Sequence, residues 1–138
     1  MQDIAIGKKR SKVKDVEVGV RISHAFDDDV DLTLFGPNGA SVELSSDNGG
    51  DEQDYGSGSA TCAGEKTVFN DEASTPIATG SAPFGGQFQP EEPLSAFDRS
   101  KLKGVWRLVA TDDIPPIDDG TLHCFELDVK YKKKKRND

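Results

Sequence analysis

Apolar and polar residues alternate along five segments of the chain, and this period of two constrains the fold more than any other feature. Successive side chains of a β-strand point to opposite faces, so alternation is typical of a strand with one buried face. The nearest approach to a helical pattern, in 94–102, suits a single helical turn. The sequence therefore predicts an all-β fold, either an antiparallel β-sandwich or a jelly roll. The alternating segments are 16–22, 30–34, 42–44, 105–110 and 124–131.

The length and the turns indicate a single domain with basic ends. The chain has 138 residues, an ordinary length for one domain. The sequence Gly-Pro-Asn-Gly at 36–39 suits a tight reversal, because proline presets one φ and Asn-Gly accepts positive φ. The long middle, 47–93, has few alternating residues, and connections of this length usually have a function or are held by a structural cross-link. We expect a basic N-terminal extension at 1–14 and a lysine-rich tail at 132–138.

The domain between these ends is strongly acidic. The chain has 17 Lys and Arg against 25 Asp and Glu, a formal charge of −8. Residues 16–129 contain 6 of the basic and 22 of the acidic residues, a formal charge of −16. Carboxylates at this density repel one another unless metal ions, the basic termini or a basic partner lie among them. An acidic chain is unsuited to general nucleic-acid binding, and no apolar run approaches the ~20 residues of a membrane span.

Acidic residues gather in segments that offer calcium ligands. Calcium takes about six to eight oxygens from carboxylates, amides and backbone carbonyls. Segments 27–31, 47–54 and 70–72 are rich in such groups, although none fits the EF-hand pattern. The alternative for each cluster alone is a solvated acidic surface. Calcium is the only cofactor that we consider, and its candidate ligands are Asp29, Asp31, Asp47, Asp51, Asp54 and Asp71.

The two cysteines, Cys62 and Cys124, are too far apart in sequence for a C-x-x-C zinc or redox motif. They are either two unrelated thiols or a disulfide that closes a long loop. In the chain-entropy estimate such a disulfide contributes roughly 4 kcal/mol to stability. If the bond forms, the protein belongs to an oxidising compartment and is secreted or exposed at the cell surface.

No catalytic constellation is evident. A Ser-His-Asp triad would need His24 or His123 beside a nucleophile on an exposed turn, and no G-x-S-x-G elbow is present. Paired carboxylates for glycoside hydrolysis remain open, but one Trp and two Tyr do not suggest an aromatic-rich cleft. Trp106 suits a sandwich core better than a sugar-binding platform. We therefore expect this chain not to be an enzyme.

Short motifs along the chain follow one another in a recognisable order. Together they resemble the P domain, also called P/Homo B, of proprotein convertases and secreted subtilisin-like serine proteases. The resemblance covers about residues 15–131. The motifs that carry it are 18–34, 36–39, 44–50, 67–73, 82–84, 88–90, 94–97, 104–108 and 120–122.

The resemblance implies a jelly-roll β-sandwich without catalytic residues, which stabilises or assists folding of an adjacent catalytic domain in the same precursor. It implies a secreted protein, and the isolated domain is expected to be monomeric, with no membrane span. The family also implies a Cys62–Cys124 bridge. Asp29 and Asp71 match acidic positions of its motifs, and Phe125 stands where relatives often carry Trp; Trp106 and Phe125 are expected in the core. The alternative is an independent adhesion or carbohydrate-binding β-sandwich of a secreted or cell-surface protein.

Overall fold

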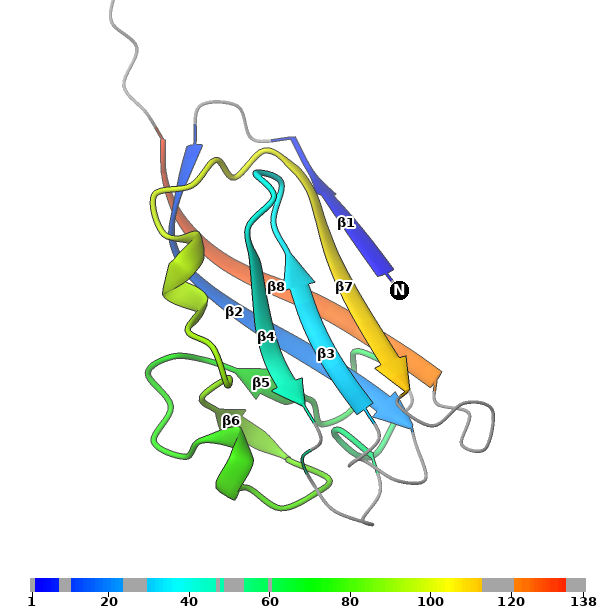
Figure 1. Ribbon diagram of the computed structural model, residues 1–138. Helices are drawn as coiled ribbons and strands as arrows, with labels where there is room; N and C mark the ends of the chain where they lie inside the picture. The colour runs from blue at the N-terminus through cyan, green and yellow to red at the C-terminus, as the bar shows by residue number, and fades with distance from the viewer. Residues whose placement is uncertain are drawn as a thin grey trace, which may run out of the picture.

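The computed structural model describes residues 2–7, 11–23, 30–46, 48, 54–59, 61–112 and 121–133. They form two four-stranded sheets packed face to face, visible as two layers in Figure 1. The first sheet has the order β1 (Gln2–Ile6), β7 (Gly104–Asp112), β3 (Val30–Phe35), β4 (Ser41–Ser46), and the second has the order β6 (Gly86–Phe88), β5 (Thr67–Phe69), β2 (Ser11–Ser23), β8 (Thr121–Lys133). The predicted all-β sandwich is confirmed, while its jelly-roll winding stays a prediction.

The alternating residues place their apolar side chains between the sheets. Along β2, Val16, Val18 and Val20 are buried, and Leu32 and Leu34 of β3 face them from the other layer. The same alternation leaves polar side chains of these strands on the outer faces. Burial of large aliphatic side chains contributes about 1.5–3 kcal/mol each, so this layer provides the main driving force for folding.

One strand pair departs from the antiparallel arrangement that the sequence predicts. β5 and β6 run parallel, with Thr67 opposite Gly86 and Phe69 opposite Phe88. A parallel partner needs a long crossover, and residues 70–85 provide it, including the 3₁₀ turn η2 (Ile77–Thr79). Every other strand pair in the described part of the chain is antiparallel.

Trp106 lies at the centre of the core. Its side chain is fully buried, and its indole Nε1 donates a hydrogen bond to the Leu102 carbonyl at 3.0 Å. Phe97, from the 3₁₀ turn η3 (Leu94–Phe97), packs edge-on against the indole with ring centroids 5.0 Å apart. Phe125 of β8 is also buried. The predicted helical turn within 94–102 is therefore present, and it supplies a core aromatic.

The basic N-terminal segment contains strand residues. β1 pairs with β7, so that Ile4 lies opposite Trp106 and Asp3 opposite Arg107. The Arg107 guanidinium donates to both Asp3 carboxylate oxygens, at 2.7 and 3.0 Å. Residues 11–14, also within the predicted extension, begin β2. No helix in the described residues is long and apolar enough to cross a membrane.

Candidate functional site

The described residues contain a hydrogen-bonded serine–histidine pair, but not a triad. Ser23 Oγ of β2 and His123 Nε2 of β8 are 2.9 Å apart. Within the described ranges no carboxylate bonds to His123, and Ser23 is the last residue of β2, paired with Thr121 of β8, instead of lying on a strained turn. His24 lies outside the described residues. The pair is a cross-strand contact and gives no basis for nucleophilic catalysis.

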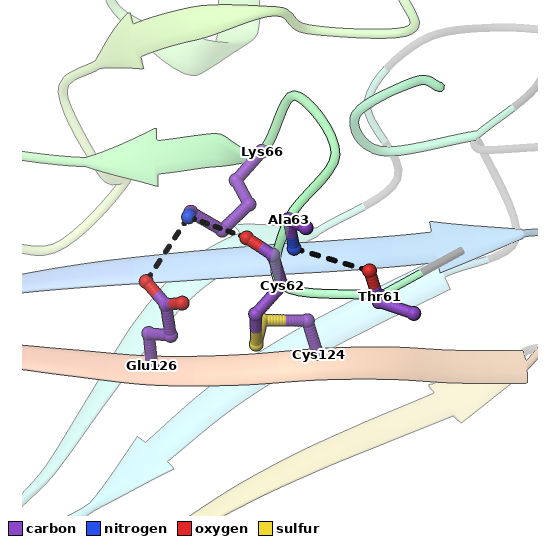
Figure 2. Close-up of polar contacts among 6 residues, drawn as sticks. All are labelled: Thr61, Cys62, Ala63, Lys66, Cys124 and Glu126. Atoms are coloured by element: carbon purple, nitrogen blue, oxygen red, sulfur yellow. Dashed lines mark hydrogen bonds and ion pairs between the residues drawn. A yellow bond between two sulfur atoms is a disulfide. The ribbon is translucent and has the colours of Figure 1, made fainter. Parts of the chain in front are cut away.

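A disulfide joins the irregular middle of the chain to the last strand. Cys62 and Cys124 are bonded, with Cα atoms 5.1 Å apart and 62 positions apart in sequence. Cys124 lies on the outer face of β8, where Figure 2 shows the 61–66 loop held above the sheet. The bond anchors this loop to an otherwise solvent-facing side of the sandwich and shields Cys124, which is buried.

Lys66 adds a second attachment beside the disulfide. Its ammonium group donates to the Cys62 carbonyl at 2.9 Å and lies 3.2 Å from the Glu126 carboxylate, as Figure 2 shows. The aliphatic part of its side chain lies over Gly19 of β2, where a Cβ would be 3.4 Å from Lys66 Cδ. The loop is therefore held by a covalent bond and by the hydrogen bond and ion pair of Lys66.

Tyr55 fixes the other half of the irregular middle, and nothing in the sequence pattern singled it out. Its backbone exchanges two hydrogen bonds with Ile22, and its hydroxyl lies 3.0 Å from Ser45 Oγ. Its fully buried ring stacks on Phe84 with centroids 5.0 Å apart, and Phe84 meets Phe88 edge-on. The sequence did contain one signal for its role. Tyr55 is the single aromatic residue in a loop rich in Asp and Gly, and an aromatic side chain in such a polar loop is a candidate for burial.

Asp71, one of the candidate calcium ligands, caps the turn η3. Its two carboxylate oxygens accept hydrogen bonds from the backbone N–H groups of Leu94 and Ser95, each at 2.8 Å. The first N–H groups of a helical turn have no partner within the turn, so a carboxylate at this end satisfies them and interacts favourably with their dipoles. Asp71 thus ties the long middle to the segment that carries Phe97.

Replacing Asp71 by alanine is expected to lower the free energy of unfolding by about 1–2 kcal/mol, because two backbone N–H groups lose their acceptor. Urea denaturation of the purified chain measures this loss. Glu72 is exposed, and within the described residues its carboxylate accepts no backbone hydrogen bond, so Glu72→Ala is the matched control and is expected to change stability by less than about 0.5 kcal/mol. Equal stability of the two variants would contradict the capping role.

The described residues do not bring three of the calcium candidates together in one group. Asp31 lies in β3 and Asp54 directly precedes Tyr55, whereas Asp71 caps η3. In the described ranges, the one group of three potential metal ligands within 4.8 Å of one another contains the two disulfide sulfurs and Glu126, and disulfide sulfurs are not thiolate ligands. Asp29, Asp47 and Asp51 lie outside the described residues.

Asp71 also belongs to an acidic depression of about 470 Å³ that Asp15, Asp98, Lys14 and Lys130 help to line. Partial burial raises the pKa of the Asp98 carboxyl, and the nearby carboxylates of Asp15 and Asp71 raise it further. A raised pKa in the folded state means that the protonated form favours folding and that this contribution is lost as pH rises through that pKa. The ionised Asp98 carboxylate therefore opposes folding slightly at neutral pH.

Comparison with known protein families finds one match. The model of the proprotein convertase P-domain matches residues 13–129, which begin in β2 and end near the end of β8. A comparison with curated proteins finds no match. The matched region contains both layers of the sandwich except β1, together with the disulfide and the capped turn. The chain therefore belongs to the proprotein convertase P-domain family.

Proposed function

We propose that this chain is the non-catalytic accessory domain of a secreted multidomain enzyme, a subtilisin-like serine endopeptidase, and that it stabilises or assists folding of the catalytic domain. The observation that carries the proposal is the family match over residues 13–129, which accounts for nearly the whole sandwich. The Ser23–His123 pair without a third group supports a non-catalytic role for the described part of the chain.

The physical basis of such a role is the thermodynamic linkage between binding and folding. A domain that binds the native catalytic domain and not its unfolded form shifts the folding equilibrium toward the native state. A partner of this kind has to be rigid, because flexibility adds an entropic cost to association. The 61–66 loop and η3, which are pinned by the disulfide and by Asp71, supply this rigidity. The disulfide also supports export to an oxidising compartment.

The proposal is tested in the natural gene product that contains this chain. Deleting residues 13–129 is expected to shorten the half-life of peptidase activity at raised temperature by about tenfold or more, which corresponds to roughly 1.4 kcal/mol of lost stabilisation. The purified chain alone is expected to hydrolyse no peptide. Peptidase activity of the isolated chain, or a deletion that leaves both folding and half-life unchanged, would refute the proposal.

The structure weakens the alternative of a carbohydrate-binding module. Sugar recognition by a tryptophan needs an exposed indole face, but Trp106 is fully buried and its Nε1 is bonded to the backbone. The aromatic residues with appreciable exposure in the described part are Phe35 and Tyr131, which lie on different sheets. They do not form one platform for a sugar ring.

Calcium binding stays a proposal for the acidic loops. It is supported by the formal charge of −16 over residues 16–129, which indicates carboxylates that lack enough cationic partners. If calcium binds the native state, excess calcium is expected to raise the melting temperature relative to the chelated protein. Magnesium at the same ionic strength is the control for screening. Equal melting temperatures in calcium and in chelator would exclude a stabilising site.

A further inference from the structure

An open groove of about 650 Å³ lies on the outer face of the first sheet. Its walls are the 36–39 turn, the segment before β7, and the outward side chains of β3 and β7. Gly104 adopts φ +133°, and a Cβ there would come within 2.6 Å of Pro37 Cβ, so the two walls touch at this point. The groove is therefore a fixed part of the sandwich surface, built on strands instead of a long loop.

The floor of the groove is apolar and exposed. Phe35 is 39% exposed and Val105 is 48% exposed. These two residues and Tyr131 are the large apolar side chains that remain exposed in the described part of the chain, and Phe35 and Val105 line the same groove. Val109 and Pro37 extend the apolar surface. Contiguous apolar surface on a domain is typical of a contact site, because water is displaced from it favourably.

Cations form the rim of this groove. Lys101, Lys103 and Arg107 line it, and they are three of the six basic residues between positions 16 and 129. Arg107 is paired with Asp3. Lys101 and Lys103 have no ion pair within the described ranges. In a body of formal charge −16, two lysines without an ion pair among the described residues thus lie beside the exposed apolar floor.

We infer that this groove is the surface on which the catalytic domain of the same precursor docks, through a patch that carries an apolar side chain among carboxylates. The inference rests on the proposed function and adds the contact face and its chemistry. An apolar anchor surrounded by charged rim residues is the usual anatomy of a protein interface. Complementary charge selects the partner and orients it, while the acidic remainder of the sandwich repels the same partner elsewhere.

The apolar floor favours a protein partner over an anionic glycan. A sulfated or uronic sugar would pair with the lysines, but it offers little apolar surface to cover Phe35 and Val105. A protein surface with an apolar side chain between two carboxylates can cover the apolar floor and pair with the lysines at the same time. The experiment below distinguishes binding of a glycan from docking of the catalytic domain.

The test uses the natural gene product with substitutions in the groove. Lys101→Glu/Lys103→Glu reverses the rim charge, and Phe35→Ser/Val105→Ser removes the floor. Each double variant is expected to shorten the half-life of peptidase activity at raised temperature by about tenfold, since it removes either the charged contacts or the apolar contacts of the docked state. Amide hydrogen exchange is expected to show protection of 35–37 and 101–107 in the whole protein, relative to the isolated chain, and loss of that protection in both variants.

Lys132→Glu is the matched control. It reverses an exposed lysine on β8, in the other sheet and outside the acidic depression, and is expected to leave the half-life and the exchange pattern unchanged. Melting of the isolated variants checks that the substitutions leave the sandwich folded. In the rim variant, 1 M NaCl is expected to change the half-life less than in the wild type, because salt screens the attraction that the variant has already lost.

The outcomes separate the two proposals. If deletion of residues 13–129 shortens the half-life but both groove variants behave as the wild type, the docking face is wrong and the proposed function stands. If the deletion has no effect, both are wrong. If 35–37 and 101–107 are protected by a sulfated oligosaccharide and not by the catalytic domain, the groove is a glycan site and the inference is overturned.

Discussion

Replacing Trp106 by alanine is expected to lower the free energy of unfolding by about 3–5 kcal/mol, the range for deleting a large aromatic side chain from a core. The indole is fully buried between the sheets, packs edge-on against Phe97 and donates to the Leu102 carbonyl. Alanine leaves a cavity that the surrounding strands cannot close without moving, and it leaves the Leu102 carbonyl without its donor. Urea denaturation with tyrosine fluorescence or circular dichroism as the signal measures the loss.

Two further substitutions separate the causes of this loss. Trp106→Phe keeps most of the apolar volume but removes the Nε1 donor, so part of the loss is expected to remain, including about 0.5–1.5 kcal/mol for the hydrogen bond. Val105→Ala, at the exposed neighbouring position of β7, is expected to cost less than about 0.5 kcal/mol. A loss of less than about 1 kcal/mol for Trp106→Ala would show that the indole is not the centre of the core.

Removing the disulfide is expected to cost about 4 kcal/mol, because the bond closes a loop with a sequence separation of 62 and restricts the unfolded chain accordingly. Cys62→Ala/Cys124→Ala deletes the bond and both sulfurs. Reduction of the wild type by dithiothreitol opens the bond while both sulfurs stay in place, so it isolates the effect of the cross-link from that of the vacated volume. Denaturant midpoints of the oxidised, reduced and double-alanine proteins give the comparison.

Lys66→Met provides the control for the neighbouring contacts. It removes the ammonium group that contacts the Cys62 carbonyl and Glu126, but it leaves the disulfide intact. A partly exposed ion pair contributes at most about 1 kcal/mol, so this variant is expected to stay close to the wild type. Equal stability of oxidised and reduced protein would mean that the loop is held by Lys66 and the sheet alone.

The long strands were predictable because their periodicity extends over many residues. Segments 16–22 and 124–131 lie within β2 and β8, and Trp106 lies on the predicted inward face of β7. β1 was missed, although Ile4 and Ile6 alternate within it, because the basic run that follows dominated the interpretation of residues 1–14. β5 and β6 have three residues each, which is too short for a period to show.

The candidate surfaces depend on contacts that a single sequence does not display. The pairing of Cys62 with Cys124 came from the resemblance to a family, since two cysteines at this spacing fit two thiols equally well. The capping by Asp71 requires the 94–97 turn to fold back on the long middle, a contact between positions more than twenty apart. The groove requires the register that sets Phe35 opposite Arg107. Lysines at 101 and 103 were visible in the sequence, but their apolar neighbours were not.

The pairing of β2 with β8 has a consequence for how the chain folds. The register joins Ser11 to Lys133 at one end and Ser23 to Thr121 at the other, so the partners are far apart in sequence. Contacts between such distant positions slow folding, because the entropy of closing a large loop is lost before the strand pairing contributes any favourable free energy. During synthesis, β2 keeps one open edge thirteen residues long until β8 leaves the ribosome. An open edge of this length is a template for pairing with other nascent chains, so ribosome-bound intermediates of this protein are exposed to aggregation.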